Sequence, residues 1–324
     1  MKIEFEITEE FQGERVDHAV ALYVKTCSRS VAASLIKSGD ILVSGEKKKP
    51  GYRIKSGDMI VGTVSDEPRP VIAGEVLEID ILHEDSHIIV LNKKAGMVVH
   101  PAPGNYSGTL VNALLHHYPL LKNVGKDIVR SGIVHRLDKD TSGVMVVAKN
   151  DSAFRFLQNE FKQRRVVKKY FALVTGNMKN DSGSITLPIG RHPVKRKIMS
   201  TKSKSARHAI TLWQVKKQFN GASFVEVELK TGRTHQIRVH FRSLGHPLIG
   251  DRVYGFKKRS KKRKDSGSLI ENQVLRQMLH AGKLSFRHPW SGRRVDFKAP
   301  LPDDFKDILR KYSASTPSSS VLAC

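Results

Sequence analysis

The N-terminal part of the chain changes from helical to strand periodicity near Gly39. Apolar residues recur at helical spacing after Asp17, and a second helical stretch ends at Gly39, a residue type that often follows a helix. Beyond it, short apolar runs lie between basic turns. The elements predicted here are a helix containing Ala19, Leu22 and Tyr23, a helix over 30–37, and strands over 41–43 and 58–61.

A polar stretch that contains proline separates this part from the rest. Residues 65–70 read SDEPRP, a composition typical of a linker between domains. We therefore predict a small N-terminal domain over 1–64, a linker over 65–75 and a larger domain over 76–312. The last residues, 313–324, are rich in serine and are predicted to form a disordered tail.

Strands dominate the larger domain, and helices lie between them. The clearest strand alternates apolar and polar residues with period two, and Phe154, Leu157 and Phe161 share one face of a helix. Strands and helices do not alternate strictly, which predicts an α+β fold with a mixed, largely antiparallel sheet and flanking helices. The predicted strands are 88–91, 144–148, 169–174, 209–215 and 224–229, and the predicted helices are 109–117 and 152–163.

The charge balance points to the kind of partner. The chain has 324 residues, with 56 Lys and Arg against 31 Asp and Glu, which gives a net charge of +25. Such an excess favours a polyanion, because each neutralised phosphate releases counterions. The apolar runs are too short to span a membrane, so nucleic acid is the first candidate and a membrane is set aside. The acidic start lacks the apolar centre of a secretory signal, which predicts a cytoplasmic protein.

Cysteine usage excludes one class of metal site. The chain has only Cys27 and Cys324, which are far apart. Two isolated cysteines exclude a cysteine-based zinc cluster and argue against a disulfide scaffold, so no structural metal is expected. They also exclude a zinc base deaminase, which needs a Pro-Cys-x-x-Cys pair.

Basic residues crowd the N-terminal domain. A solvated surface on any small domain would account for them. The order of elements favours another interpretation, because residues 28–30, 35–39 and 41–45 together resemble the S4 RNA-binding module. Val16 and Ser44 differ from the Leu and Asn common in that module, at positions that would not contact phosphate. The resemblance implies RNA contacts from Arg15, Arg29, Lys37 and Lys47.

The segment 134–143, VHRLDKDTSG, packs polar and charged residues between two apolar strands. A loop of this kind on a rigid sheet is a common place for functional groups. A turn decorated with salt bridges is the plain alternative. The kinase catalytic loop is also similar to His-Arg-Leu-Asp, but the chain lacks the downstream Asn, the glycine-rich loop and the Asp-Phe-Gly of kinases.

Residues 135–143 resemble the signature of the ribosomal large-subunit family of pseudouridine synthases. Residues 91–101 resemble the first motif of that family, with Lys94 where Pro is usual. The resemblance covers nearly the whole chain and is nearest to the D-type enzymes, which implies action on uridines of 23S ribosomal RNA. Further matching segments are 169–172, 231–240, 250–251, 254–255, 279–281, 288–289 and 299–302.

The resemblance implies that Asp138 is the essential catalytic group. Pseudouridine formation moves the bond of the ribose from a nitrogen to a carbon of uracil without redox change, so no cofactor is expected. A carboxylate beside the sugar would act as nucleophile, base or electrostatic stabiliser, and the residues leave all three open. It must stay charged, which a buried carboxylate does beside a cation, and Arg238 is the candidate.

The periodicity around Arg238 fits either a strand or a helix. Thr234 is a suitable helix cap and Gly245 a suitable stop, which favours a helix over 236–244. Ile237 then faces the core, and Arg238 lies beside it at the edge of the site.

Other side chains are assigned to the substrate. Tyr170 either packs in the core or stacks on the uracil, and the resemblance favours stacking. Arg136 would fill the gap that an extruded base leaves in folded RNA. His100, His135 and His235 are expected as structural hydrogen-bond donors rather than as acids or bases. The residues expected to bind substrate are His135, Arg136, Arg233 and Ile237.

Two points stay open in the sequence. The basic stretches 195–207 and 257–264 lie in predicted loops, and the second is either a solvated disordered loop or an RNA contact. The main rival function is a non-catalytic RNA-binding or ribosome-assembly protein, which would have lost Asp138, Tyr170 or Arg238. A hydrolase or ligase would need metal-ligand or phosphate-loop spacing. We expect a monomer that acts on 23S ribosomal RNA, free or within an assembling subunit.

Overall fold

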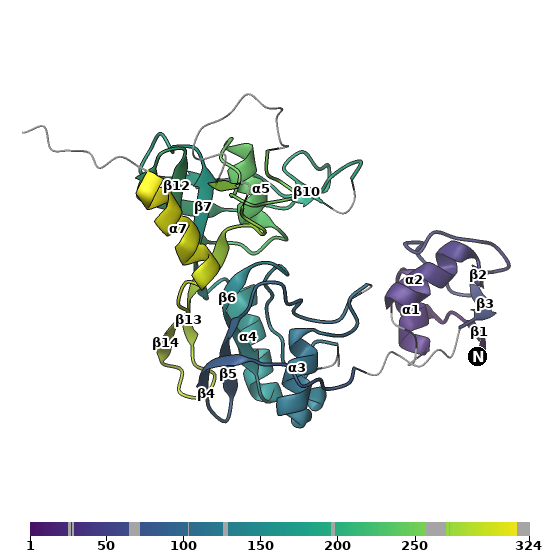
Figure 1. Ribbon diagram of the computed structural model, residues 1–324. Coiled ribbons are helices and arrows are strands. Elements are labelled where there is room, and N and C mark those ends of the chain that lie inside the picture. Colours follow the sequence, from purple (N-terminus) through teal and green to yellow (C-terminus); the bar gives the residue numbers. More distant parts are fainter. Residues whose placement is uncertain are drawn as a thin grey trace, which may run out of the picture. The chain divides into compact units, whose positions relative to one another are not determined.

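The chain divides into two units, Met1–Val71 and Ile72–Cys324 (Figure 1). The structure is a computed structural model, and it describes residues 1–24, 27, 29–64, 72–102, 104–125, 129–195, 198–256, 270–271 and 273–315.

The second unit begins inside the range predicted to be linker. Ile72 is buried in the core of this unit, and the backbone N–H of Glu75 donates to the Asn112 carbonyl at 2.9 Å. Residues 72–75 therefore belong to the second unit. The rest of the predicted linker, 65–71, lies outside the described residues.

The N-terminal unit consists of a three-stranded antiparallel sheet and two helices. Both predicted helices and both predicted strands are present, and a further strand, β1, pairs with β3 and makes it the central strand. The sequence does carry a signal for β1, because Ile3 and Phe5 alternate with polar residues and are buried. The elements are β1 Lys2–Glu6, a 3-10 turn Glu9–Phe11, α1 Val16–Tyr23, α2 Arg29–Ser38, β2 Ile41–Val43 and β3 Met59–Thr63.

A nine-stranded sheet forms the centre of the second unit. Its order is β4-β5-β6-β13-β7-β12-β11-β8, and β14 also pairs with β13. Among the described strands only β13 and β6 run parallel, so the predicted α+β fold with a mixed, largely antiparallel sheet is confirmed. Its strands are β4 Asp80–Glu84, β5 Ile88–Lys93, β6 Ser142–Ala148, β7 Val167–Thr175, β8 Ser182–Ile185, β11 Thr211–Phe219, β12 Ala222–Leu229, β13 Leu279–Arg287 and β14 Arg294–Lys298.

A separate two-stranded ribbon pairs β9 Gly190–Arg191 with β10 Met199–Ser200. The basic stretch 195–207, predicted as a loop, therefore contains a short strand. The second basic stretch, 257–264, lies outside the described residues.

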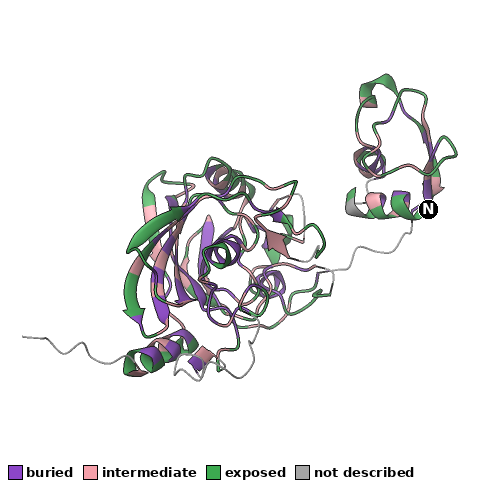
Figure 2. Cartoon of the chain, turned by 90° about the horizontal axis from the view of Figure 1, so that it is seen from above, coloured by how far each residue is buried: buried purple, intermediate pink, exposed green. Residues whose placement is uncertain are grey.

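Helices cover the sheet in two separate cores. In β7, Ala172 packs into one core together with α3 Leu110–His117, α4 Asp151–Lys162 and α5 Gln236–Ser243. Leu173, on the opposite face of the strand, packs into the other core with α7 Asp303–Ser315. Figure 2 shows buried residues along the central strands and exposed residues on the outer sides of the helices.

The last helix corrects the predicted start of the tail. α7 continues to Ser315, and Tyr312 is fully buried in the second core. Residues 313–315 are therefore helical. The remaining residues of the predicted tail, 316–324, lie outside the described part.

The seam between β6 and β13 requires a glycine. Gly143 has φ +121°, and a Cβ placed on it would lie 2.3 Å from the Ala281 carbonyl oxygen and 2.5 Å from its nitrogen. Both distances are shorter than any side chain tolerates. Because the segment 134–143 enters β6 at this point, the seam fixes where that segment begins its strand.

We predict that Gly143→Ala lowers the free energy of unfolding by about 3 kcal/mol or more, since strain and overlap add. Gly232→Ala is the matched control, because Gly232 has no atom within 4 Å of its would-be Cβ and no left-handed backbone. Urea unfolding followed by circular dichroism measures both variants. Equal losses in the two would contradict the steric account.

Candidate active site

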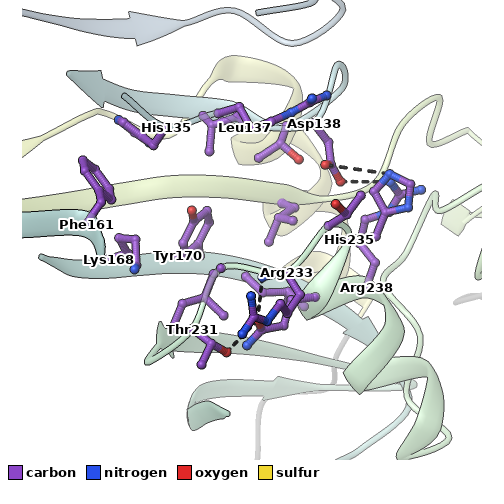
Figure 3. A pocket seen from close by; sticks show the side chains of 18 of the residues that line it. His135, Leu137, Asp138, Phe161, Lys168, Tyr170, Thr231, Arg233, His235 and Arg238 are labelled. Carbon is purple, nitrogen blue, oxygen red and sulfur yellow. Dashed lines mark hydrogen bonds and ion pairs between the residues drawn. The ribbon is translucent and has the colours of Figure 1, made fainter. Parts of the chain in front are cut away.

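A cavity of about 450 Å³ opens where the segment before β6 faces β7 and the start of α5 (Figure 3). Asp138, Tyr170 and Arg238 all line it, although they come from three separate elements. The other residues predicted to bind substrate line it too: His135, Arg136, Arg233 and Ile237. The structure therefore brings together every residue that the sequence assigns to this site.

Arg238 is shared between two carboxylates. Its Nη1 donates to Asp138 Oδ2 at 3.0 Å, as the sequence predicts. Its Nε and Nη2 donate to Asp251 Oδ2 and Oδ1 at 2.7 and 3.0 Å, which is a bidentate pair. The Arg238 side chain is 6% exposed, and the guanidinium lies 5.0 Å from the centre of the Tyr254 ring. The position of the cation beside Asp138 is thus set from the opposite side by Asp251.

Asp251 is itself fixed in position by several hydrogen bonds. Its side chain is fully buried, and Oδ1 also accepts from the backbone N–H groups of Val253 and Tyr254 at 2.9 Å each. Burial by itself would raise the pKa of Asp251, but the hydrogen bonds and charge of Arg238 and the backbone donors keep the pKa below its usual value. For Arg238, burial opposes the charged form, and the two carboxylates together raise its pKa above its usual range.

The carboxylate of Asp138 is less buried than the sequence suggests. Its side chain is 22% exposed, which leaves it open to the cavity. His235 Nε2 lies 3.8 Å from Asp138 Oδ1. Burial lowers the pKa of His235, although the charge of Asp138 opposes this shift. Asp138 therefore has one charged partner and one free approach from the cavity.

Helix α5 begins differently from the prediction. Its N-cap is His235, not Thr234, and His235 has left-handed backbone dihedrals with φ 55°. No side chain caps the helix; Gln236, its first residue, instead ties the helix to the preceding turn, because its Oε1 accepts from the backbone N–H of Arg233 and from the hydroxyl of Thr231. His235 Nδ1 lies 2.8 Å from the Tyr254 hydroxyl. The strained residue thus lies beside Asp138, tied to the loop that carries Asp251.

The predicted C-terminal end of the helix is confirmed. Gly245 has φ 84°, and the backbone N–H of His246 donates to the Phe241 carbonyl at 3.0 Å. Ile237 is buried in the core as expected, together with Phe241, and Ile237 also reaches the cavity.

Two buried cations hold the backbone of the loop that carries Asp138. Lys93 is 1% exposed, and its ammonium donates to the carbonyls of Lys94, Met97 and Lys139 at 2.8, 2.9 and 3.0 Å. Burial lowers the pKa of Lys93 to about 7. Arg276 donates to the Asp140 carbonyl at 3.1 Å. The two residues that follow Asp138 are therefore fixed through their carbonyl oxygens.

Tyr170 lies on the floor of the cavity. It is 8% exposed and belongs to the main core, so core packing and cavity lining both apply to it. Its hydroxyl makes no hydrogen bond to any described residue. Burial, with the nearby charge of Asp138, raises the pKa of Tyr170 above its usual value, so the ring is neutral. A neutral aromatic face beside Asp138 is suited to a flat ligand.

His135 and Arg136 occupy different parts of the cavity. His135 Nε2 accepts from the backbone N–H of Val146 at 3.0 Å, and its ring stacks on Phe161 with centres 4.6 Å apart. The structural role expected for it holds, but as an acceptor rather than a donor. Burial lowers the pKa of His135 to about 3. Arg136 is exposed, and its Nη1 lies 3.4 Å from His100 Nε2.

The residues predicted to contact RNA in the N-terminal unit differ in their pairing within the protein. Asp17 is buried and pairs with Arg15 at 2.6 Å and with Arg29 at 3.3 Å, so both arginines support the fold. Lys47 is exposed and donates to the Ser38 carbonyl, and Lys37 is exposed. Ser44 has φ 50°, a conformation that Asn adopts more readily, which explains why Asn is common there.

The described residues contain no group of three His, Cys, Asp or Glu arranged to hold a metal ion. No helix within the described ranges is long and apolar enough to cross a bilayer.

Comparison with known proteins places the chain in a family. The model of the family described as RNA pseudouridylate synthase matches residues 87–243, and that of the S4 domain matches residues 14–60. An RNA pseudouridine synthase of Bacillus subtilis is 40% identical over 308 residues, which cover 95% of this chain and 97% of that protein. The chain belongs to the RNA pseudouridine synthase family.

Other RNA pseudouridine synthases are similar over comparable lengths. The ribosomal large subunit pseudouridine synthase D of Zymomonas mobilis is 42% identical over 315 residues, 95% of this chain and 97% of that protein. The solved structure of human RNA pseudouridylate synthase domain containing 4 has a TM-score of 0.57 and 26% identity, and it covers 72% of this chain and 93% of its own. The two resemblances, to pseudouridine synthases and to the S4 module, are confirmed.

Asp251, Lys93 and Arg276 are site residues of this RNA pseudouridine synthase that the sequence interpretation leaves without a role. Asp251 lies in a matching segment, but nothing in its local pattern indicates a pair with a residue 13 positions earlier. Lys93 ends an apolar strand, where a lysine ordinarily reaches solvent. Arg276 has no periodic signal around it. Burial of each charge is the property that marks them, and it is visible only in the fold.

We predict that Asp251→Asn lowers the stability of the RNA pseudouridine synthase by about 3 to 5 kcal/mol, because it breaks a buried ion pair. In the folded fraction, kcat should fall by roughly 100-fold with little change in KM, since a misplaced Arg238 no longer positions Asp138. Unfolding curves and steady-state kinetics at low temperature measure the two effects.

Glu160→Gln is the matched control for this prediction. Glu160 is 1% exposed and pairs with Arg165 and Arg287 at 2.6 and 2.8 Å, but it does not line the cavity. It should lose stability and keep kcat. Wild-type kcat in folded Asp251→Asn would show that Arg238 needs no second carboxylate.

Proposed function

We propose that this protein converts specific uridines of 23S ribosomal RNA into pseudouridine, with Asp138 as the catalytic carboxylate. The observation that carries the proposal is the position of Asp138: it is the one carboxylate among the described residues that line the cavity, and Arg238 lies 3.0 Å from it. A carboxylate open to a cavity, with a fixed cation behind it, is suited to act on a bound nucleotide.

The reaction needs a charged group beside the sugar and no electron carrier. The bond between ribose C1′ and uracil N1 breaks, the base turns, C5 bonds to C1′, and the proton of C5 leaves while N1 gains one. Oxidation states at the end balance those at the start, so the proposal requires no cofactor. Asp138 acts as nucleophile, base or electrostatic stabiliser at this centre, and each role uses the same oxygen facing the cavity.

The other lining residues bind and extrude the base. The Tyr170 ring forms the surface on which uracil stacks, and Ile237 packs at its edge. A base in folded RNA must leave its stack first, and exposed Arg136 at the cavity fills the gap it leaves. His135 forms the wall of the cavity beside Phe161 and does not titrate near neutral pH. Arg233 binds the RNA backbone at the same cavity.

The names of the relatives support the choice of substrate. Several, including those of Zymomonas mobilis and Pseudomonas aeruginosa, are ribosomal large subunit pseudouridine synthases D. The S4 domain and the net charge of +25 fit a polyanionic RNA. We propose that the protein works as a monomer in the cytoplasm, on free ribosomal RNA or on an assembling large subunit.

Mapping of pseudouridines in 23S ribosomal RNA from cells with and without the protein tests this function. Specific pseudouridines should be missing without it and return when the wild-type gene is restored. Identical maps would contradict the proposal and favour a non-catalytic RNA-binding protein.

We predict that Asp138→Ala and Asp138→Asn abolish pseudouridine formation and leave RNA affinity within about threefold, because the carboxylate acts on the reacting nucleotide while basic residues supply most of the binding. Tritium release from 5-tritiated uridine in RNA, or mass spectrometry, measures formation. Measurable turnover by Asp138→Ala would contradict the catalytic role of Asp138.

We predict that removal of residues 1–71 weakens ribosomal RNA binding and flattens its dependence on salt, because the phosphate contacts of the N-terminal unit are lost. The second unit has its own core and should still modify a short RNA. Binding titrations at several salt concentrations measure the effect. An unchanged salt dependence would show that the S4 domain does not contact phosphate.

A further inference from the structure

The cavity has a large excess of positive charge. Arg238 is neutralised by its two carboxylates, and Asp138 is the only acidic residue among the described lining. Five other cations line the same cavity: Arg136, Lys162, Arg164, Lys168 and Arg233. Such an excess of positive charge around one cavity favours an anionic ligand.

The two lysines of strand β7 lie on opposite faces of the sheet. Lys168 and Tyr170 are two residues apart and point to the cavity, whereas Lys169 points to the other side. Lys169 pairs with Glu226 at 2.9 Å. Lys168 has no ion pair or hydrogen bond to any described residue, so the lysine at the cavity is the one without a direct carboxylate partner.

The turn before β7 repeats this arrangement. Arg165 pairs with buried Glu160 at 2.6 Å, on the side away from the cavity. Arg164, which lines the cavity, has no ion pair within the described part of the chain. In both neighbouring pairs, the cation that does not line the cavity pairs with a carboxylate, and the cation that lines the cavity forms no ion pair with a described residue.

The surroundings of Lys168 make an unpaired charge costly. Its ammonium lies 5.9 Å from the centre of the Phe161 ring, and it is half-buried beside Tyr170 (Figure 3). Burial lowers the pKa of Lys168, the charge of Arg164 lowers it further, and the charge of Glu228 opposes the shift only in part. An anion between the two cations would relieve both effects.

We propose that Lys168 and Arg164 form a binding site for a backbone phosphate of RNA, next to the uridine that stacks on Tyr170. This inference rests on the proposed function. The Cα atoms of Lys168 and Tyr170 are about 7 Å apart along the strand, which lets one nucleotide reach both with its base and its phosphate. A lysine point charge and an arginine fork are both common phosphate ligands.

The test measures binding of a single-stranded oligouridylate to the full-length protein over a series of salt concentrations. All proteins carry Asp138→Asn, so that no chemistry occurs. Lys168→Met should bind about tenfold more weakly at low salt, the loss of one charge-assisted hydrogen bond. The slope of log affinity against log salt should fall by about 0.7, the value for one phosphate of a single strand.

Two variants serve as controls. Lys168→Arg keeps the charge and should keep the slope. Lys169→Met removes the paired lysine on the other face and should leave both affinity and slope unchanged. Arg164→Ala, at an exposed side chain, should lower the slope as Lys168→Met does, and it carries the test if Lys168→Met does not fold.

A second probe, oligouridylate with neutral methylphosphonate linkages, separates phosphate from uracil as the group bound. Lys168→Met and the parent should bind this probe equally. Weaker binding of the neutral probe by Lys168→Met would assign Lys168 to the base and overturn the proposal, as would an unchanged slope with the charged probe.

Failure of this site and failure of the proposed function give different results. The binding measurements use catalytically inactive protein and do not depend on pseudouridine formation. Unchanged salt slopes, together with pseudouridines that are missing from cells without the protein, would overturn the phosphate site alone. Lowered slopes with no change in the maps would overturn the proposed reaction alone.

Discussion

The guanidinium of Arg238 between Asp138 and Asp251 is the interaction on which the site depends. Asp251 binds two of its nitrogens at 2.7 and 3.0 Å from within the protein, which leaves the third directed at Asp138. The buried Arg238–Asp251 pair fixes the position of the positive charge, and the Asp138 carboxylate stays accessible from the cavity. The Asp138 carboxylate is thereby held without being enclosed, because the residue that holds it is itself anchored by Asp251.

The rest of the second unit keeps the elements of this arrangement in register. Gly143 lets β6 run close against β13, and Lys93 and Arg276 hold the backbone carbonyls that follow Asp138. Helix α5 presents Arg238 because its core face is buried with the main sheet. The loop that carries Asp138 therefore has few alternative positions, and its geometry is a property of the packed sheet rather than of the loop itself.

The local sequence pattern predicted the helix that carries Arg238 but not all of its contacts. The periodicity around Arg238 fitted a strand or a helix, and the end signals, Gly245 among them, predicted the helix that the structure has; its pairing with Asp138 followed from the need of a carboxylate for a cation. The helix cap at Thr234 was wrong, because the N-cap lies one residue later, at His235, and Gln236 fixes the start of the helix through contacts with Arg233 and Ile210 that the sequence does not show. The role of Asp251 could not be predicted from local pattern, because its contact with Arg238 forms only when the loop of Asp251 packs against helix α5.

A structure of the Asp138→Asn protein with a bound RNA substrate tests the account most directly. The account predicts that the target uridine has left its stack, that its ring lies on Tyr170 with the ribose beside residue 138, and that Arg238 keeps its bidentate contact with Asp251. RNA bound with the cavity empty and every uridine stacked, or a uridine ring placed away from residue 138, would contradict it.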